Sequence, residues 1–276
     1  MLIDEFSFAA PEYSLPRILA IRAIELASGQ PRLKRLYRGY QAENLPHSAF
    51  WNEAVRLLNL DMRLYGSGFD KIPETGPLVV VANHPYGVLD GIAICWLVAQ
   101  KRQDFKILIN NVLCRAPEIE PHVLPVDFTE TPEALTTNLA SRKQARDILD
   151  AGGVVIVFPA GGISTTRRLF ARIAEDDPWA PLVGQLVRRS KASVLPVFFD
   201  GQNSLAFQMA SHISYALRVA LIFREVCRRI GTPLDMVVGE PLDFAQMEPH
   251  LPPKKLANFL QTHTHALRRF IDGATD

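Results

Sequence analysis

His84 and Asp90 flank one short turn, with five residues between them, and together they could remove a proton from a hydroxyl. A neutral imidazole accepts a proton near pH 7, because its unperturbed pKa is about 6.5. A carboxylate on the other ring nitrogen fixes the tautomer and stabilises the imidazolium that forms. This chemistry needs both groups on one turn, so the spacing predicts a general base with an orienting carboxylate.

The same two residues also fit structural roles. Asp90 stands just before an apolar segment and could cap the N-terminus of a helix with its side chain. His84 precedes Pro85 and could be an ordinary turn residue. The spacing alone leaves these interpretations open beside the catalytic one.

The turn lies where an α/β sheet would carry a site. It follows the β-branched run of residues 78–82, which is typical of a buried strand, and it precedes an apolar helix predicted over residues 91–102. Open α/β sheets build their sites at the carboxyl ends of strands. We therefore expect His84 and Asp90 at such an edge.

A second strand end is rich in glycine. The apolar run of residues 153–158 ends in Pro-Ala-Gly-Gly at 159–162, and glycines after a strand let backbone N–H groups approach an oxyanion or a phosphate closely. An ordinary turn would also explain the glycine pair. Arg167 and Arg168 follow a few residues later and could reach an acidic headgroup.

A third apolar run, residues 193–199, contains Pro196 and ends in a polar turn. A proline inside an apolar run is unusual for a central strand.

Strands and helices alternate from residue 76 onward. The predicted strands are 78–82, 105–109, 122–126, 153–158, 193–199 and 235–238, and the predicted helices between them are 91–102, 132–150, 178–190 and 203–230. This alternation, with nearly continuous apolar strands, predicts an α/β fold with a mainly parallel sheet covered by helices on both faces.

The ends of the chain are predicted to be helical. Helical spacing over 15–28 and a second helix around 48–65 indicate a helical N-terminal preface, residues 1–70, packed on a sheet domain of residues 71–276. A closing amphipathic helix is expected at about 252–272.

The bulk charge is nearly balanced. The net charge is +1 over 276 residues, and 48% of the residues are hydrophobic, so we expect a large core and no nucleic-acid partner. Three local clusters are basic, and they are either solvated helix faces or contacts for an anionic membrane lipid surface. The clusters are Arg32, Lys34, Arg35 and Arg38; Arg188, Arg189 and Lys191; and Arg224, Arg228 and Arg229.

Several patterns indicate a cytoplasmic protein that is soluble or lies on the inner face of a membrane. The three cysteines are scattered, which fits a reducing compartment. The first residues are acidic where a signal peptide would be basic. No segment approaches the roughly 20 apolar residues that span a bilayer. His263 and His265 have no partner ligands nearby in the sequence, so we expect no metal site.

The order of the three strand-end stretches resembles the glycerolipid acyltransferase superfamily, the 1-acylglycerol-3-phosphate O-acyltransferase-like proteins. The family's first block is Asn-His followed by a downstream Asp, and Asn83, His84 and Asp90 resemble it. The third block, Phe-Pro-Glu-Gly, resembles residues 158–161, and the fourth, an apolar strand with an internal proline, resembles residues 194–197.

The second block is matched more weakly, by residues 123–127, where the family has a strand that ends near an arginine. The resemblance covers roughly residues 60–240.

The resemblance implies a reaction. His84 would deprotonate the acceptor hydroxyl, Asp90 would orient it, and the hydroxyl would attack the thioester of a fatty acyl-CoA or acyl-carrier protein. No cofactor, metal or covalent acyl-enzyme is implied. The acceptor would be a lysolipid. The residues expected to bind substrate are Asn83, Tyr86, Gly87, Arg115, Phe158, Pro159, Gly161, Gly162, Ser164, Arg167 and Arg168.

The chain departs from the family pattern in its spacing. The family usually has four residues between His and Asp rather than five, although a related subgroup carries His-Pro-Leu-Gly-Gly-Leu-Asp. Gly87 can adopt backbone angles that absorb the extra residue.

Three residue types also depart from the family. Ala160 replaces the third-block Glu, and Phe128 and Ile163 stand where arginines that bind the acceptor phosphate are expected. A buried phosphate without arginine partners is costly. The resemblance therefore implies one of two acceptors: lysophosphatidic acid, bound instead by Arg115, Arg167 or Arg168, or a lysolipid with another headgroup, such as lyso-ornithine lipid.

Two rival functions use the same residues. A lipid-binding protein that has lost catalysis would explain the three departures, and a thioesterase would use the His–Asp pair with water as acceptor. There is no Gly-x-Ser-x-Gly elbow and no phosphate-binding Gly-x-x-x-x-Gly-Lys loop, which disfavours a serine hydrolase and a nucleotide hydrolase.

Overall fold

The computed structural model describes five stretches of the chain, and all statements about structure concern them. They are residues 14–66, 68–110, 117–129, 131–169 and 171–273.

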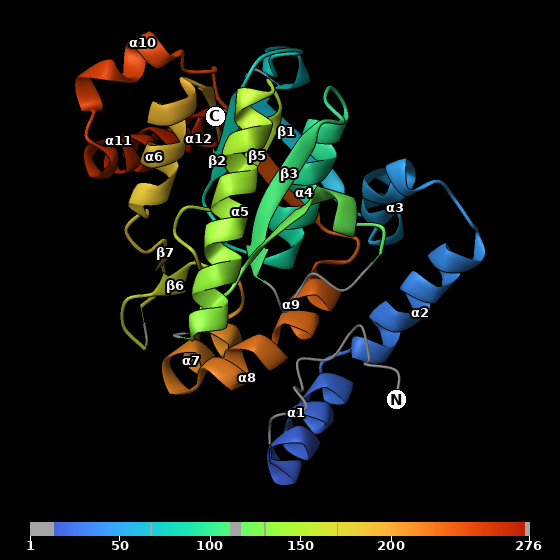
Figure 1. The fold of residues 1–276 in the computed structure, drawn as a ribbon. Coiled ribbons are helices and arrows are strands. Elements are labelled where there is room, and N and C mark those ends of the chain that lie inside the picture. The colour runs from blue at the N-terminus through green and yellow to red at the C-terminus, as the bar shows by residue number, and fades with distance from the viewer. Residues whose placement is uncertain (1–13, 67, 111–116, 130, 170, 274–276) are drawn as a thin grey trace.

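One seven-stranded sheet forms the centre of the molecule (Figure 1), with the strand order β1-β9-β8-β2-β5-β3-β4. Every neighbouring pair is parallel except β8 and β9, so the prediction of a mainly parallel sheet is confirmed. Two short strands, β6 and β7, form a separate antiparallel pair. The strands are β1 Asp61–Gly66, β2 Leu78–Ala82, β3 Phe105–Asn110, β4 Val123–Val126, β5 Val154–Val157, β6 Thr165–Thr166, β7 Ala174–Glu175, β8 Ser193–Phe199 and β9 Pro233–Val238.

The helices connect and flank these strands. They are α1 Leu15–Ala27, α2 Gln30–Ala42, α3 Phe50–Leu57, α4 Val88–Ala99, α5 Pro132–Asp150, α6 Pro181–Ser190, α7 Leu205–Ile213, α8 Tyr215–Ala220, α9 Ile222–Arg229, α10 Phe244–Met247, α11 Pro253–Ala266 and α12 Arg269–Asp272. None of the helices in the described part of the chain is long and apolar enough to cross a membrane.

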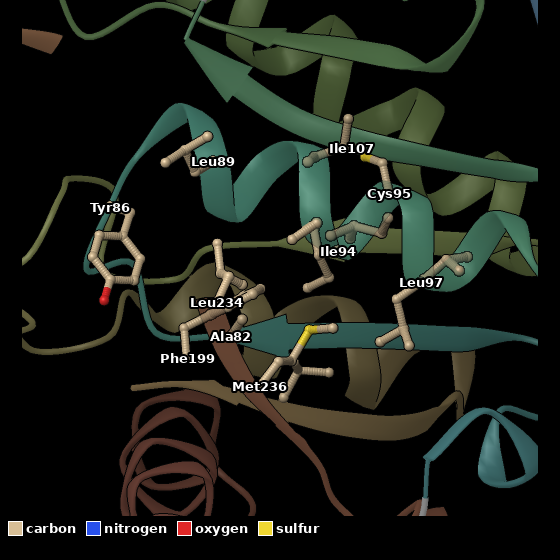
Figure 2. Packing of buried hydrophobic residues seen from close by; sticks show 14 of the residues in the cluster. Ala82, Tyr86, Leu89, Ile94, Cys95, Leu97, Ile107, Phe199, Leu234 and Met236 are labelled. Carbon is tan, nitrogen blue, oxygen red and sulfur yellow. The ribbon is translucent and has the colours of Figure 1, made fainter. Parts of the chain in front are cut away.

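Helices cover both faces of the sheet, as expected. Because successive side chains of a strand point to opposite faces, Val80 of β2 lies in one hydrophobic core and Val79 in the other. The first core includes residues of α4 and α9, and the second includes residues of α5, α6 and α11. Figure 2 shows part of the first core, where Ile94 of α4 belongs to the same cluster as Leu234 and Met236 of β9.

The helix predicted over residues 48–65 is wrong in its second half. α3 ends at Leu57, and Asn59 then adopts a left-handed backbone with φ 45°, which no helix continues. The chain next enters β1, which pairs in parallel with β9 along its whole length. Its partner lies far away in the sequence, so the local pattern could not reveal the strand. The division of the chain at residues 70 and 71 stays a prediction.

The single helix predicted over 203–230 is also wrong. The segment forms α7, α8 and α9, because Ser214 is extended, with φ −160° and ψ 132°, and ends α7. The closing helix expected at 252–272 is likewise divided into α11 and α12. Apolar periodicity continues across these breaks, so it does not mark them.

Gly184 brings α6 close to the start of α11, and a side chain there has no room. A Cβ on Gly184 would lie 2.2 Å from the carbonyl oxygen of Pro253. We expect Gly184→Ala to lower the free energy of unfolding by about 1–3 kcal/mol, measured by urea denaturation, because backbone must move. In the control Gly39→Ala, where a Cβ meets nothing within 4 Å, stability should rise slightly. Equal stability of wild type and Gly184→Ala would show that the two helices are not held this closely.

Candidate active site

Asn83 fixes the point where the chain leaves β2. Its Nδ2 donates to the carbonyl oxygen of Phe199 at 2.8 Å, and its Oδ1 accepts from the Phe199 amide at 2.7 Å. Phe199 is the last residue of β8, the neighbour of β2, so the side chain extends the pairing of the two strands by one step. Asn83 is buried, and its side-chain amide thereby sets where the next residue, His84, begins the turn.

Asp90 closes the turn from the first helical turn of α4. Its Oδ2 accepts from the backbone N–H groups of Tyr86 and Gly87, both at 2.8 Å. The same oxygen lies 3.1 Å from Nδ1 of His84, which is ion-pair distance, although the ring N–H is not aligned with it as a hydrogen bond. Asp90 is the third residue of α4 and not its N-cap, which is Gly87, and its side chain both accepts from the cap backbone and faces the imidazole.

The carboxylate of Asp90 is shielded from solvent. The side chain is fully buried, and burial raises the pKa of Asp90 above its ordinary value. His84 and the two backbone N–H groups act in the opposite direction, because they favour the ionised form. Oδ1 of Asp90 has no hydrogen-bond partner among the described residues. The carboxylate is thus poorly hydrated, and it interacts strongly with any charge that develops on the imidazole.

The His84 ring has one buried and one available edge. Nδ1 is buried on the Asp90 side, and the side chain as a whole is 17% exposed. The ring stacks on Phe158, with 4.0 Å between the ring centroids and 28° between the planes. Because Nδ1 faces the carboxylate, Nε2 is the nitrogen that can receive a proton from a substrate.

Gly87 makes the longer His–Asp spacing possible. Its backbone has φ 82° and ψ −112°, which side chains disfavour, and a Cβ there would lie 2.6 Å from Cδ1 of Ile163. The expectation that this glycine absorbs the extra residue agrees with the geometry.

The glycine-rich third block lies directly against the His84 turn. The amide of Ser164 donates to the carbonyl oxygen of His84 at 2.8 Å. Gly161 has φ 73°, and the backbone of Pro159 accepts from Ala180 at 2.9 Å, which holds the loop over the end of β5. The structure therefore brings together the first and third blocks, as the sequence predicted.

Asp176 is a buried residue of this site that the sequence analysis missed. Its Oδ1 accepts from the His84 amide at 3.2 Å and from the hydroxyl of Ser164, and its Oδ2 accepts from the indole of Trp179 at 3.0 Å. Nε2 of His265 lies 3.8 Å from Oδ2. The amide and the carbonyl of His84 are thus both held by the segment 164–176.

The donors around Asp176 keep it ionised. Burial alone would raise the pKa of Asp176, but its polar neighbours, with His265 and Ser164 first, outweigh burial and hold the pKa below its ordinary value. No spacing rule relates Asp176 to His84, because 92 positions separate them and the contact runs through backbone.

Tyr86 has a structural place in the turn. Its hydroxyl donates to the carbonyl oxygen of Asp200 at 2.9 Å, and the guanidinium of Arg229 lies 4.5 Å from its ring centroid. Burial raises the pKa of Tyr86 to about 12, so its hydroxyl keeps its proton near neutral pH.

The arginines expected to bind the headgroup lie apart from the His84 turn or outside the described residues. Arg167 is 80% exposed and pairs with Glu175 across the β6–β7 strands, and Arg168 is exposed. Arg115 lies outside the residues that the structure describes. Arg218 of α8, which the sequence analysis did not single out for binding, lies against Gly162 instead, because a Cβ on that glycine would be 3.3 Å from Nη2 of Arg218.

The three residues that depart from the family pattern are apolar, and they differ in their burial. Ala160 packs at the border of the second hydrophobic core, and Ile163 contacts Gly87. The exposed ring of Phe128 lies near Gly161. Among the residues that the structure describes, no three His, Cys, Asp or Glu side chains cluster as a metal site would require.

The arrangement as a whole can remove a proton from a bound hydroxyl. A half-covered imidazole stands at the carboxyl end of β2, one of its nitrogens faces a buried carboxylate, and a glycine turn passes beside it. This is the geometry of a general base with an orienting partner.

Comparison with known proteins gives matches along most of the chain. Residues 18–274 match the profile of a protein family described as acyltransferase. A lyso-glycine lipid O-acyltransferase from Phocaeicola vulgatus is 24% identical over 220 residues, which cover 75% of this chain and 74% of that protein. A protein of the same name from Bacteroides thetaiotaomicron is 23% identical over 222 residues, 75% of this chain and 76% of that protein.

A solved structure has the same fold. The 1-acyl-sn-glycerophosphate (LPA) acyltransferase PlsC from Thermotoga maritima aligns with a TM-score of 0.54 over 92% of this chain and 97% of that chain. The sequences are 15% identical, so this likeness concerns the architecture.

The contacts of Asp176 predict how stability depends on pH. In Asp176→Asn a charged acceptor becomes neutral, so we expect the free energy of unfolding at pH 7 to fall by about 2 kcal/mol. Because the folded-state pKa lies below the unfolded value of about 3.9, this stabilisation is present above that pH and is lost as the pH falls through the folded-state pKa. The difference in the free energy of unfolding between wild type and Asp176→Asn, measured by urea denaturation, should therefore become smaller in acid.

Asp177→Asn is the matched control, because the neighbouring side chain is exposed. It should change stability little at any pH. A gap between wild type and Asp176→Asn that stays constant from pH 7 into acid would contradict the assigned ionisation.

Proposed function

The chain belongs to the acyltransferase family, and from this we propose that it moves a fatty acyl chain from a thioester donor to the hydroxyl of a lysolipid. The observation that carries the mechanism is the distance of 3.1 Å between Nδ1 of His84 and the buried Oδ2 of Asp90. The glycine-rich turn of residues 159–162 lies beside this pair. Two relatives named lyso-glycine lipid O-acyltransferase support the class of acceptor.

The proposed reaction needs no covalent enzyme intermediate. Nε2 of His84 takes the proton of the acceptor hydroxyl as its oxygen attacks the thioester carbonyl. Asp90 faces Nδ1 and stabilises the imidazolium that forms. The tetrahedral intermediate then collapses, the C–S bond breaks, and the thiolate leaves with the proton that His84 carries. The products are the acylated lipid and the free thiol of coenzyme A or of acyl-carrier protein.

The acceptor that we propose is a lysolipid of the amino-acid type rather than lysophosphatidic acid. Ile163 packs against the first hydrophobic core and Phe128 is an exposed aromatic ring near Gly161, at the positions where a phosphate-binding arginine would be expected. The glycine headgroup in the name of the two relatives carries a carboxylate and no phosphate. Lyso-glycine and lyso-ornithine lipids are both candidates of this class.

We also propose that the protein works on a membrane surface, on the cytoplasmic face, where it would meet its lipid acceptor. Large apolar side chains are exposed along α1, at Leu15, Leu19 and Leu26. Exposed apolar surface of this kind supports contact with lipid. α1 packs against α8, which places it on the side of the molecule where Arg218 lies.

Replacing the proposed base tests the reaction directly. In His84→Ala we expect acyl transfer to fall by a factor of about 10²–10⁴, because general base catalysis is lost. Release of free thiol from acyl-CoA or acyl-carrier protein, with a panel of lysolipids, measures it. The free energy of unfolding of His84→Ala should be nearly that of wild type. The control His47→Ala, at an exposed histidine, should keep full activity.

Retained turnover in His84→Ala would contradict the mechanism. Thiol release that does not rise when lysolipid is added would contradict the acceptor and indicate a thioesterase. Lipid binding without thiol release from any donor would indicate a protein that has lost catalysis.

Asp90→Asn separates catalysis from binding. The amide oxygen of Asn can still accept from the turn's N–H groups, but the charge that stabilises the imidazolium is gone. We expect kcat to fall by about 10²-fold or more while KM for the donor stays within a factor of about two. Circular dichroism should show an intact fold. A loss that appears only in KM would mean that Asp90 does not act on the chemical step.

A further inference from the structure

We propose that Arg218 of α8 binds the anionic group of the acceptor's headgroup beside the Gly161–Gly162 turn. The proposal rests on the lysolipid acyltransferase activity and deepens it, because it names the residue that selects the acceptor. The ligand chemistry is a carboxylate, as in an amino-acid headgroup, or a phosphate monoester.

The glycine turn lies close to the base. Ser164, two residues after Gly162, donates its amide to the carbonyl oxygen of His84 at 2.8 Å. Between them, Ile163 packs on Gly87 in the His84 turn. A headgroup held at Gly162 would therefore lie on the same turn that holds the backbone of His84.

Arg218 lies against the bare backbone of this turn. A Cβ on Gly162 would be 3.3 Å from Nη2 of Arg218, so the glycine leaves the guanidinium in contact with the main chain. Arg218 is half-buried, which reduces the screening of its charge by water. A guanidinium presents paired N–H groups that match the two oxygens of a carboxylate or phosphate.

The apolar neighbours of the turn in the described part of the chain do not supply this charge. The ring of Phe128 lies near Gly161, and Ile163 on the other side of Gly162 is apolar as well. Arg167 is turned to solvent and paired with Glu175. Among the described residues, Arg218 meets this turn with a cation, and it comes from α8, an element far along the chain from the three sequence blocks.

The surroundings of α8 suit a lipid. α8 packs against α1, whose Leu15 and Leu19 are exposed, and Figure 1 shows α1 extending beyond α8 at the lower end of the molecule. An acceptor whose headgroup meets Arg218 can therefore direct its chain toward apolar surface.

Kinetics with matched acceptors test the proposal. We expect Arg218→Ala to raise KM for lyso-glycine lipid about 10–100-fold with kcat nearly unchanged, because a charge-assisted pair is lost. KM for the methyl ester of the same lipid should not change, since the ester lacks the anion. Lysophosphatidic acid, assayed in parallel, distinguishes a phosphate from a carboxylate as the preferred group. Arg142→Ala, at an exposed arginine of α5 outside the basic clusters, is the control and should behave as wild type.

Gly162→Ala gives a second, independent test. Its Cβ would push the guanidinium by a few tenths of an ångström, so KM for the free acid should rise in the wild-type background. In the Arg218→Ala background the same change should add nothing, because the two substitutions act on one contact. Fully additive effects would overturn the proposal.

A binding measurement separates this proposal from the proposed function. Lyso-glycine lipid is titrated calorimetrically into His84→Ala and into His84→Ala with Arg218→Ala, so no turnover is needed. Weaker binding of the free acid, but not of the methyl ester, to the double variant supports the site even if the wild type transfers no acyl chain. Equal binding to both variants, or equal losses for acid and ester, would overturn it.

Discussion

The contact on which the site depends is that between the buried carboxylate of Asp90 and the turn that carries His84. One oxygen accepts from two backbone N–H groups of that turn and also lies beside Nδ1 of the imidazole. The conformation of the turn and the direction of the ring are therefore fixed by one charge. Because this charge is fully buried, it has little water to interact with, and a proton arriving on the imidazole is stabilised by it.

A second carboxylate supports the turn from outside. Asp176 holds the His84 amide, and Ser164, which donates its hydroxyl to Asp176, also donates its amide to the His84 carbonyl. Trp179 and His265 complete the set, so the segment just before α6 and the helix α11 contribute to the same site. Both the amide and the carbonyl of His84, the proposed base, are thus held by hydrogen bonds, which limits the freedom of its ring.

The sequence predicts the parts of this structure that local pattern determines, and it fails where distant segments meet. β2, β5 and β8 are continuous apolar runs, and the turn residues between β2 and α4 are adjacent in the chain, so both were predicted. The local pattern over β1 predicts helix instead, because the strand's partner β9 lies far away in the sequence. Asp176 and Arg218 were missed for the same reason, since each reaches the site through a contact that only the fold creates. The breaks within 203–230 were missed because apolar spacing continues across the extended residue Ser214.

The most direct test of this account is the tautomer of His84, read from the ¹⁵N chemical shifts of its ring in histidine-labelled protein at a pH where the ring is neutral. The carboxylate of Asp90 should hold the proton on Nδ1 and leave Nε2 bare to accept one from the acceptor hydroxyl. A ring that carries its proton on Nε2 could not act as the base from its available edge, and this result would contradict the central claim.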